Sequence, residues 1–221
     1  MTTHSITNTL IENNKSAYLN ATQHPFLKQL GSAQINPAAL EKFLNQDRIF
    51  ALGYCKWLSA IGGRIPILER SDSAEMVDSE DVKLLNLISF AVSNGLREVD
   101  MFPNTLTSLN LQFTEVEASE TCYAYIRYLY SLRDNDEALV ALWALEKIYL
   151  DGWSYAKSKD AATSSPSPYT ELLDNWTCPS FVNFVDSDLK YQVERLKGGT
   201  DKLNDIFSQI CQHEISFFQH T

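Results

Sequence analysis

Hydrophobic residues recur three and four positions apart through most of the chain, which is the spacing of one face of an α-helix. Alternating hydrophobic and polar runs, typical of strands, are nearly absent. The pattern predicts an all-α fold. Helices are expected at about 5–21, 24–30, 37–61, 81–101 with a continuation to 110, 119–132, 136–158, 169–175, 179–196 and 200–221.

Turn and cap residues mark the ends of these helices. Asn36 and Pro37 form an N-cap followed by proline in the first turn, and the pair Gly62–Gly63 ends that helix. Pro103 is expected to kink or end the helix that contains it. The acidic segment 64–80 and the Ser- and Pro-rich segment 159–168 are predicted to be exposed loops. Neither resembles an interdomain linker, so one domain is predicted over residues 1–221.

Acidic residues occupy several positions where these helical faces call for apolar side chains. Asp47 follows Leu40, Phe43 and Leu44 on one face, Glu146 lies between Leu142 and Leu150, and Glu214 lies between Ile210 and Phe218. Glu98 fits this pattern least well, because Arg97 stands beside it and the pair could face solvent.

A buried carboxylate is costly unless it is hydrogen-bonded, paired or protonated. Any one of these residues could cap or bond a neighbouring helix. Several helices that each turn a carboxyl group inward point instead to a shared polar cavity. A carboxyl group in apolar surroundings has a raised pKa and can act as a general acid or base near neutral pH.

The composition limits the classes of binding partner and the cellular location that the sequence predicts. The 221 residues carry a net charge of −10, which disfavours binding to nucleic acid. No run approaches the length of a membrane span or a signal peptide, so a cytoplasmic protein without a membrane partner is predicted. The 4 cysteines are widely spaced, and we expect most of them to be small buried residues rather than disulfide partners.

The sequence disfavours a metal centre. Di-iron helical bundles use Glu-x-x-His, but the residues three positions after Asp47, Glu98, Glu146 and Glu214 are Phe50, Met101, Tyr149 and Phe217. No metal is therefore predicted. The phosphate-binding and nucleophile-elbow motifs are absent as well. His24 precedes a proline at a helix boundary, which favours a capping or packing role over haem ligation.

Five short motifs, in this order, resemble those of the TenA (thiaminase-II) family across nearly the whole chain. They are HPFL at 24–27, LNQD at 44–47, CYAYIRYL at 122–129, ALWALEKIY at 141–149 and EISFF at 214–218. The resemblance implies a heme oxygenase-like helical fold that binds no haem and needs no cofactor. It also implies hydrolysis of aminopyrimidines related to thiamin, in salvage of its pyrimidine half, and a homo-oligomer, with dimers for the Glu type.

The resemblance assigns roles to individual residues. Asp47 would hydrogen-bond the pyrimidine nitrogen and amino group, and Tyr125 would line the pocket. Tyr149 would orient the reacting groups, Glu214 would be the acid/base beside the scissile C–N bond, and Phe217 would pack on the ring.

Departures from the commoner pattern indicate the subclass that uses glutamate. Leu145 stands where Cys-type members have their nucleophile, and Glu146 follows it. Trp176 and Phe50 each replace a tyrosine of the Cys type. The activity implied is hydrolysis of 4-amino-5-aminomethyl-2-methylpyrimidine, deformylation of its N-formyl derivative, or both.

Without that cysteine, water is the expected nucleophile, and Glu214 and Glu146 are the expected acid/base pair. Which of the two is the base stays open at this point. Three rivals also stay open. They are a relocated thiol nucleophile at Cys122 or Cys211, a non-catalytic aminopyrimidine-binding or regulatory protein, and an oxidase with a carboxylate-rich metal site.

Overall fold

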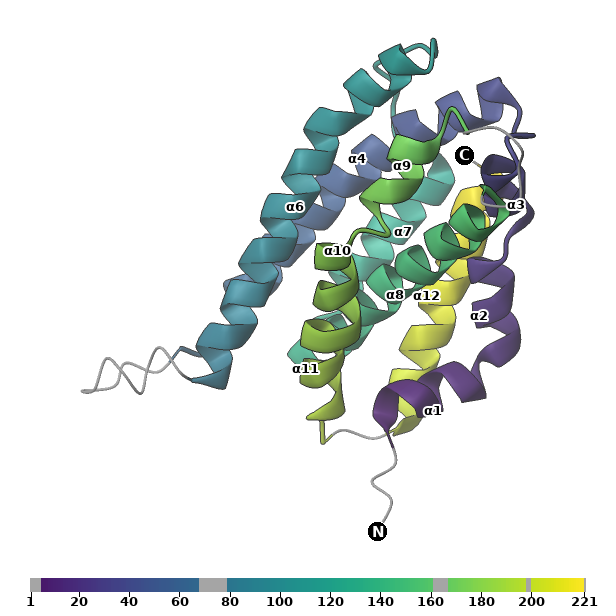
Figure 1. Ribbon diagram of the computed structural model, residues 1–221. Coiled ribbons are helices and arrows are strands. Elements are labelled where there is room, and N and C mark those ends of the chain that lie inside the picture. The colour runs from purple at the N-terminus through teal and green to yellow at the C-terminus, as the bar shows by residue number, and fades with distance from the viewer. Residues whose placement is uncertain (1–4, 68–78, 161–166, 198–199, 221) are drawn as a thin grey trace.

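The computed structural model describes residues 5–67, 79–160, 167–197 and 200–220 (Figure 1). Every regular element in these ranges is helical, which confirms the predicted all-α fold. In chain order they are α1 (Ile6–Asn13), α2 (Lys15–Thr22), α3 (Pro25–Gly31), α4 (Pro37–Gly62), α6 (Glu80–Ser108), α7 (Glu120–Ser131), α8 (Asn135–Asp160), α9 (Thr170–Asn175), α10 (Pro179–Asn183), the π-helix η1 (Phe184–Leu189), α11 (Lys190–Glu194) and α12 (Thr200–His220).

Helix α8 forms the centre of the bundle. It contacts α2, α3, α9, α11, α12 and η1, and every residue from Ala138 to Glu146 is buried. Apolar residues surround its whole circumference, as expected of a helix enclosed by others. Side chains of α8 are therefore held from several directions.

Helices α4 and α6 run side by side along one edge of the molecule (Figure 1). Helix α4 also contacts α7, so it lies between α6 and the rest of the bundle. Helix α6 is more exposed, and it leaves Phe90 and Leu96 about half accessible, at 47% and 49%. One side of α6 thus faces the core while another faces solvent.

The helix predicted at 5–21 is in fact two helices, α1 and α2, which meet at Asn14. The side-chain amide of Asn14 donates to the Leu10 carbonyl oxygen at 2.9 Å and to Asn204 Oδ1 at 3.4 Å. An asparagine that bonds the backbone in this way competes with the helical hydrogen-bond ladder. The break lets both α1 and α2 contact α12.

The segment predicted as one helix at 179–196 contains three elements, because the π-helix η1 separates α10 from α11.

Pro103 was expected either to kink or to end its helix, and it does not end it. Helix α6 continues through Pro103 to Ser108 instead of ending there, although proline cannot donate the usual backbone hydrogen bond.

The predicted caps are present. Asn36 Oδ1 accepts from the Ala38 backbone N–H at 2.9 Å, and His24 Nδ1 accepts from the Phe26 N–H at 3.2 Å. The capping role of His24 is therefore confirmed. Most of the two predicted loops, residues 68–78 and 161–166, lies outside the described residues.

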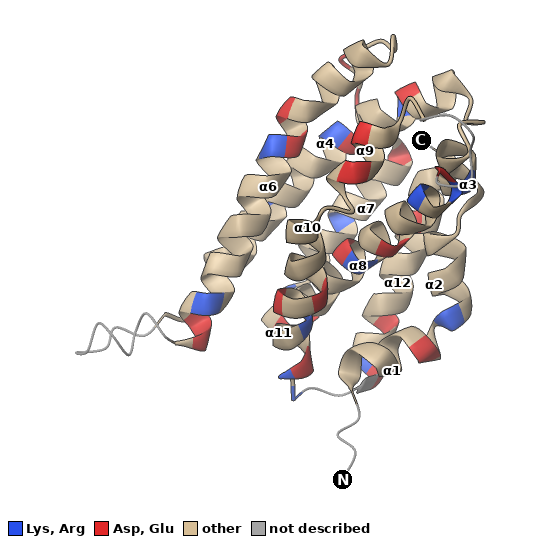
Figure 2. Ribbon diagram, viewed as in Figure 1, with Lys and Arg blue, Asp and Glu red and all other residues tan. Residues whose placement is uncertain are grey.

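None of the described helices is long and apolar enough to span a lipid bilayer. Lys and Arg positions are distributed over many helices of the described part of the chain and alternate with Asp and Glu (Figure 2).

Candidate active site

Four carboxyl groups from four different helices lie close enough for their charges to interact. They belong to Asp47 on α4, Glu98 on α6, Glu146 on α8 and Glu214 on α12. Asp47 and Glu146 each feel the charge of Glu98, and Glu214 feels the charges of Asp47 and Glu146. Asp47 and Glu146 therefore occupy the middle of this carboxyl cluster, with Glu98 and Glu214 at its ends.

Tyrosine hydroxyl groups bind three of the four carboxyl groups, and each bond joins two helices. Tyr149 on α8 donates to Asp47 Oδ1 at 2.9 Å, and Tyr125 on α7 donates to Glu214 Oε1 at 2.7 Å.

The third tyrosine, Tyr54 on α4, donates to Glu146 Oε1 on α8. Helices α4 and α8 are thus bonded twice in opposite senses, since each supplies one tyrosine and one acid to the other. This reciprocity fixes the spacing of the two middle acids.

Burial changes the protonation of these three groups. Asp47, Glu146 and Glu214 are 3%, 8% and 1% exposed. Loss of hydration raises the pKa of each carboxyl group to about 8 and outweighs the opposing effect of its tyrosine hydrogen bond. Neighbouring negative charge raises the pKa values further. All three groups can consequently exchange protons near neutral pH.

Glu214 carries the one carboxyl oxygen of the cluster that is buried without a hydrogen-bond partner among the described residues, Oε2. A buried unsatisfied oxygen is costly, and such atoms are concentrated at ligand and catalytic sites. A bound substrate or water molecule that donates to Oε2 would remove this cost.

Glu98 faces the core, as its place on the apolar face of its helix indicated, and not solvent, which was the alternative that Arg97 left open. Its Oε1 accepts from the Trp176 indole N–H at 2.9 Å, and from the amides of Asn94 at 3.2 Å and Asn175 at 3.4 Å. Burial raises the pKa of Glu98 to about 7, and Arg97 and the three donors oppose that rise. Glu98 is thus the fourth member of the cluster.

Aromatic rings form a wall beside the carboxyl groups. The Phe50 ring lies 4.7 Å from that of Tyr125 and 5.6 Å from that of Phe217, centre to centre. Across the cluster, Tyr149 meets Trp176 edge to face at 5.8 Å. Flat apolar faces next to hydrogen-bonding groups suit a planar heteroaromatic ligand.

The structure therefore brings together the eight residues that the sequence indicated. Phe50, Tyr125 and Phe217 form one set of contacts, and Tyr149 and Trp176 form a second. The hydrogen bond from Tyr149 to Asp47 joins the second set to the acids. Sequence reasoning assigned no role to Tyr54, although it lies seven positions after Asp47 on the same helical face. The contributions of Asn94 and Asn175 left no recognisable signal in the sequence.

The cysteines match the expectation of small buried residues at Cys55, Cys122 and Cys211, while Cys178 is partly exposed. All four are free thiols. Burial raises the pKa of both Cys122 and Cys211 to about 12, so neither carries the thiolate that a nucleophile requires at neutral pH.

Among the described residues, no three His, Cys, Asp or Glu side chains are grouped so that they could hold a metal ion. His213 instead stacks on the ring of Tyr125, with centres 4.8 Å apart.

Comparisons with known proteins place this geometry in context. The chain is 20% identical to the "Probable bifunctional TENA-E protein" of Glycine max over 221 residues, which covers 96% of this chain and 91% of the soybean protein. Among solved structures it resembles PF1337, a TenA homologue from Pyrococcus furiosus, with a TM-score of 0.81 at 20% identity over 97% of this chain and 98% of the other.

It also resembles a TenA family transcription regulator from Silicibacter, with a TM-score of 0.79 at 14% identity over 97% of this chain and 95% of the other. At these identities the likeness to solved structures shows a shared fold. The model of the TENA/THI-4/PQQC family matches residues 11–221. The chain therefore belongs to the TENA/THI-4/PQQC family.

Proposed function

We propose that this protein is a Glu-type hydrolase that cleaves a C–N bond in thiamin-related aminopyrimidines. One observation carries the proposal. Three buried acids with raised pKa values, each held by a tyrosine from another helix, stand beside an aromatic wall. The fully buried Cys122 and Cys211 remain protonated at neutral pH, and position 145 is leucine, so the chemistry falls to the acids.

Substrate recognition would use the aromatic wall and Asp47. The pyrimidine ring packs against Phe50, Tyr125 and Phe217. The centre of the Phe50 ring lies 4.7 Å from that of Tyr125 and 5.6 Å from that of Phe217. The Asp47 carboxyl group, fixed by Tyr149, hydrogen-bonds a ring nitrogen and the exocyclic amino group. A carboxyl group can accept from the amino group and, when protonated, also donate to the ring nitrogen.

The reaction would use Glu146 and Glu214 as a pair that differs in protonation. The ionised member removes a proton from water, and the protonated member donates one to the leaving nitrogen where that nitrogen belongs to an amide. The charge of Glu146 raises the pKa of Glu214, so ionisation of one member favours the protonated form of the other. Oε2 of Glu214 is available to bind the attacking water, at the end of the cluster away from Glu98.

Two substrates fit this apparatus. For the aminomethyl compound, which binds as its ammonium form, a glutamate removes a proton from water, the water oxygen bonds to the methylene carbon, the C–N bond breaks, and neutral ammonia leaves without a further proton. For the N-formyl compound, water adds to the formyl carbon, the amide C–N bond breaks, and formate and the free amine result. Both need one water and no net change in oxidation state.

The test is product formation by the purified protein from the aminomethylpyrimidine, its N-formyl derivative and thiamin. We expect release of ammonia or formate, and loss of that release in Glu214→Gln. Full turnover by Glu214→Gln would contradict the assignment of Glu214. Saturable binding of an aminopyrimidine by a folded protein that turns over none of the three compounds would favour a binding or regulatory role instead.

A further inference from the structure

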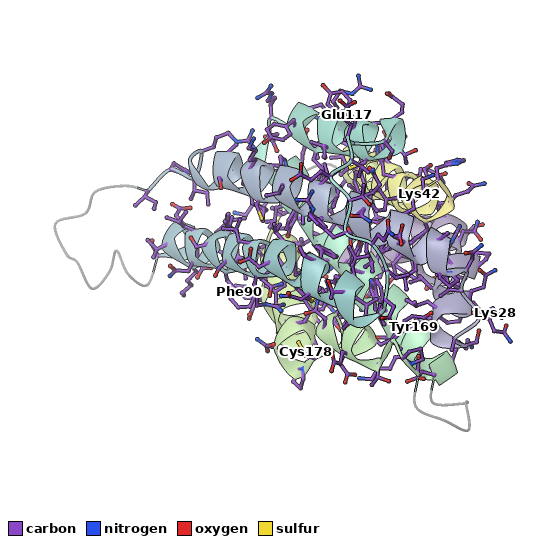
Figure 3. The ribbon with its side chains drawn as sticks, turned by 90° about the horizontal axis from the view of Figure 1, so that it is seen from above. Lys28, Lys42, Phe90, Glu117, Tyr169 and Cys178 are labelled. Carbon is purple, nitrogen blue, oxygen red and sulfur yellow. The ribbon has the colours of Figure 1, made fainter. Side chains whose placement is uncertain are left out.

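A surface groove of about 450 Å³ lies between α6 and the segment formed by α9 and α10. Its lining includes Phe90, Asn94 and Arg97 from α6, and Asn175 and Cys178 from the opposite side. Phe90 and Cys178 lie along the same edge of the molecule when it is viewed from above (Figure 3). The groove therefore follows the exposed side of α6.

Two residues that line this groove also hydrogen-bond the carboxyl cluster. The side-chain amides of Asn94 and Asn175 line the groove and also donate to Glu98 Oε1. Glu98 is the member of the cluster that is not fully buried, since 14% of its side chain is exposed, whereas Asp47, Glu146 and Glu214 are buried. Glu98 thus stands at the outer end of the cluster, next to the two asparagines that line the groove.

A positively charged side chain already occupies this outer position. The Arg97 guanidinium donates to Asn94 Oδ1 at 3.0 Å and to Asn175 Oδ1 at 3.1 Å. Its Nη2 lies 3.9 Å from Glu98 Oε1. The two asparagines consequently bridge a cation and an acid. Because half of the Arg97 side chain is exposed, its displacement by another cation would cost little.

Glu98 also has capacity for a further partner. The three donors within hydrogen-bond distance all reach Oε1, and in the described part of the chain no donor reaches Oε2. A carboxylate oxygen at the mouth of an acidic cluster favours a cationic ligand over a neutral one.

We propose that the groove is the entrance to the active site and that Glu98 is a specificity residue, whose free oxygen binds the cationic aminomethyl group of the substrate in preference to the neutral formamidomethyl group. This inference rests on the proposed function. An aliphatic amine is charged at neutral pH, and an amide is not. The amine would displace Arg97 and face the solvent-accessible end, through which the ammonia product leaves.

The test compares wild-type enzyme with Glu98→Gln on both substrates. Glutamine keeps an oxygen that can accept from Trp176, Asn94 and Asn175, and replaces the charged free oxygen with an uncharged NH2 group. We expect kcat/KM for the aminomethyl substrate to fall about tenfold or more, mainly through KM, because a hydrogen bond to a charged group is lost. For the N-formyl substrate, kcat/KM of the variant should stay within about threefold of the wild-type value. That change is smaller than the loss of such a hydrogen bond would cause.

Glu120→Gln is the matched control. Glu120 lies on α7, is not a lining residue of the groove, carries the same charge and has an 85% exposed side chain. It should leave kcat/KM for both substrates unchanged. An equal loss for both substrates in Glu98→Gln, or no loss for either, would overturn the assignment.

A binding measurement separates this inference from the proposed function. Calorimetric titration of Glu214→Gln, which keeps Glu98 and is expected to lack turnover, compares the aminomethylpyrimidine with its hydroxymethyl analogue, which has a similar shape but no charge. We expect the amine to bind about tenfold more tightly near pH 7. Equal affinities would overturn the role of Glu98 even if the wild-type protein is catalytically active, and a tenfold preference without turnover by the wild-type protein would retain it while the hydrolase assignment failed.

Discussion

Helices α8 and α6 each supply one acid to the cluster, but their surroundings differ. Helix α8 is enclosed by six other helical elements, and its Glu146 is 8% exposed. Helix α6 packs mainly against α4, and a groove borders its other side where Glu98 lies. Enclosure fixes Glu146 and raises its pKa, whereas partial exposure leaves Glu98 accessible to ligands from outside. One cluster thus combines a rigid interior with an accessible rim.

The largest effect should come from the enclosed side. Glu146→Gln removes one member of the proposed proton-transfer pair while keeping its shape, so kcat should fall about 10² to 10⁴-fold. Steady-state kinetics on the preferred substrate measures the loss. Glu120→Gln, with a side chain that is 85% exposed on α7, is the control and should retain full activity. An active Glu146→Gln enzyme would show that the enclosed acid is structural.

Packing around α8 gives the second test. A Cβ at Gly31 on α3 would lie 2.0 Å from the Ala156 carbonyl oxygen of α8, which cannot move without the backbone. Gly31→Ala should lower the free energy of unfolding by about 3 kcal/mol, as measured by urea denaturation.

Gly62→Ala is the contrasting variant on the α4–α6 side. Its Cβ would meet Leu85 and Ile88 at 3.4 and 3.5 Å, an ordinary contact. It should be neutral or stabilising by up to about 1 kcal/mol, because alanine favours helix over glycine. Equal destabilisation by the two variants would mean that both sides are packed alike.

The buried acids make stability depend on pH. Asp47, Glu146 and Glu214 have folded-state pKa values of about 8 against ordinary values of 3.8 or 4.5, so the folded state holds more protons than the unfolded state between these values. The free energy of unfolding, and with it the melting temperature, should therefore fall as pH rises from about 4.5 to 8. Glu214→Gln should flatten this decline, and an unchanged slope would argue against a raised pKa at Glu214.

A smaller effect is expected at Tyr125, whose hydroxyl lowers the pKa of Glu214 by hydrogen bonding. Tyr125→Phe should raise that pKa further, shift the corresponding limb of the pH–rate profile to higher pH, and reduce kcat about tenfold or less. Tyr123→Phe, on an exposed face of α7, should leave the profile in place. A profile that stays fixed in Tyr125→Phe would separate Tyr125 from the titrating group.

Helical periodicity was sufficient to predict the all-α fold and the inward acids on α4, α8 and α12, because an acid on an apolar face stands out in sequence. Tyr54 was missed because a tyrosine on such a face resembles an ordinary core residue. Only the position of α8 shows that its hydroxyl meets Glu146.

Glu98 shows the opposite difficulty. Its neighbour Arg97 suggested a solvated pair, yet the two side chains have different surroundings. Arg97 is 54% exposed, while Glu98 is 14% exposed and turns toward Trp176. The groove cannot be read from sequence because α6 and α9 are about 80 positions apart and meet only through tertiary packing. The break at Asn14 likewise depends on a bond to Asn204 on α12.

The central claim is that water attacks the substrate and the protein acids only move protons. A single-turnover reaction of the aminomethyl substrate in water labelled with heavy oxygen, analysed by mass spectrometry, tests it most directly. Direct attack by water predicts the label in the alcohol formed in the first turnover. An unlabelled alcohol in that turnover would mean that a carboxylate oxygen attacked the carbon to form an ester, and would contradict the account.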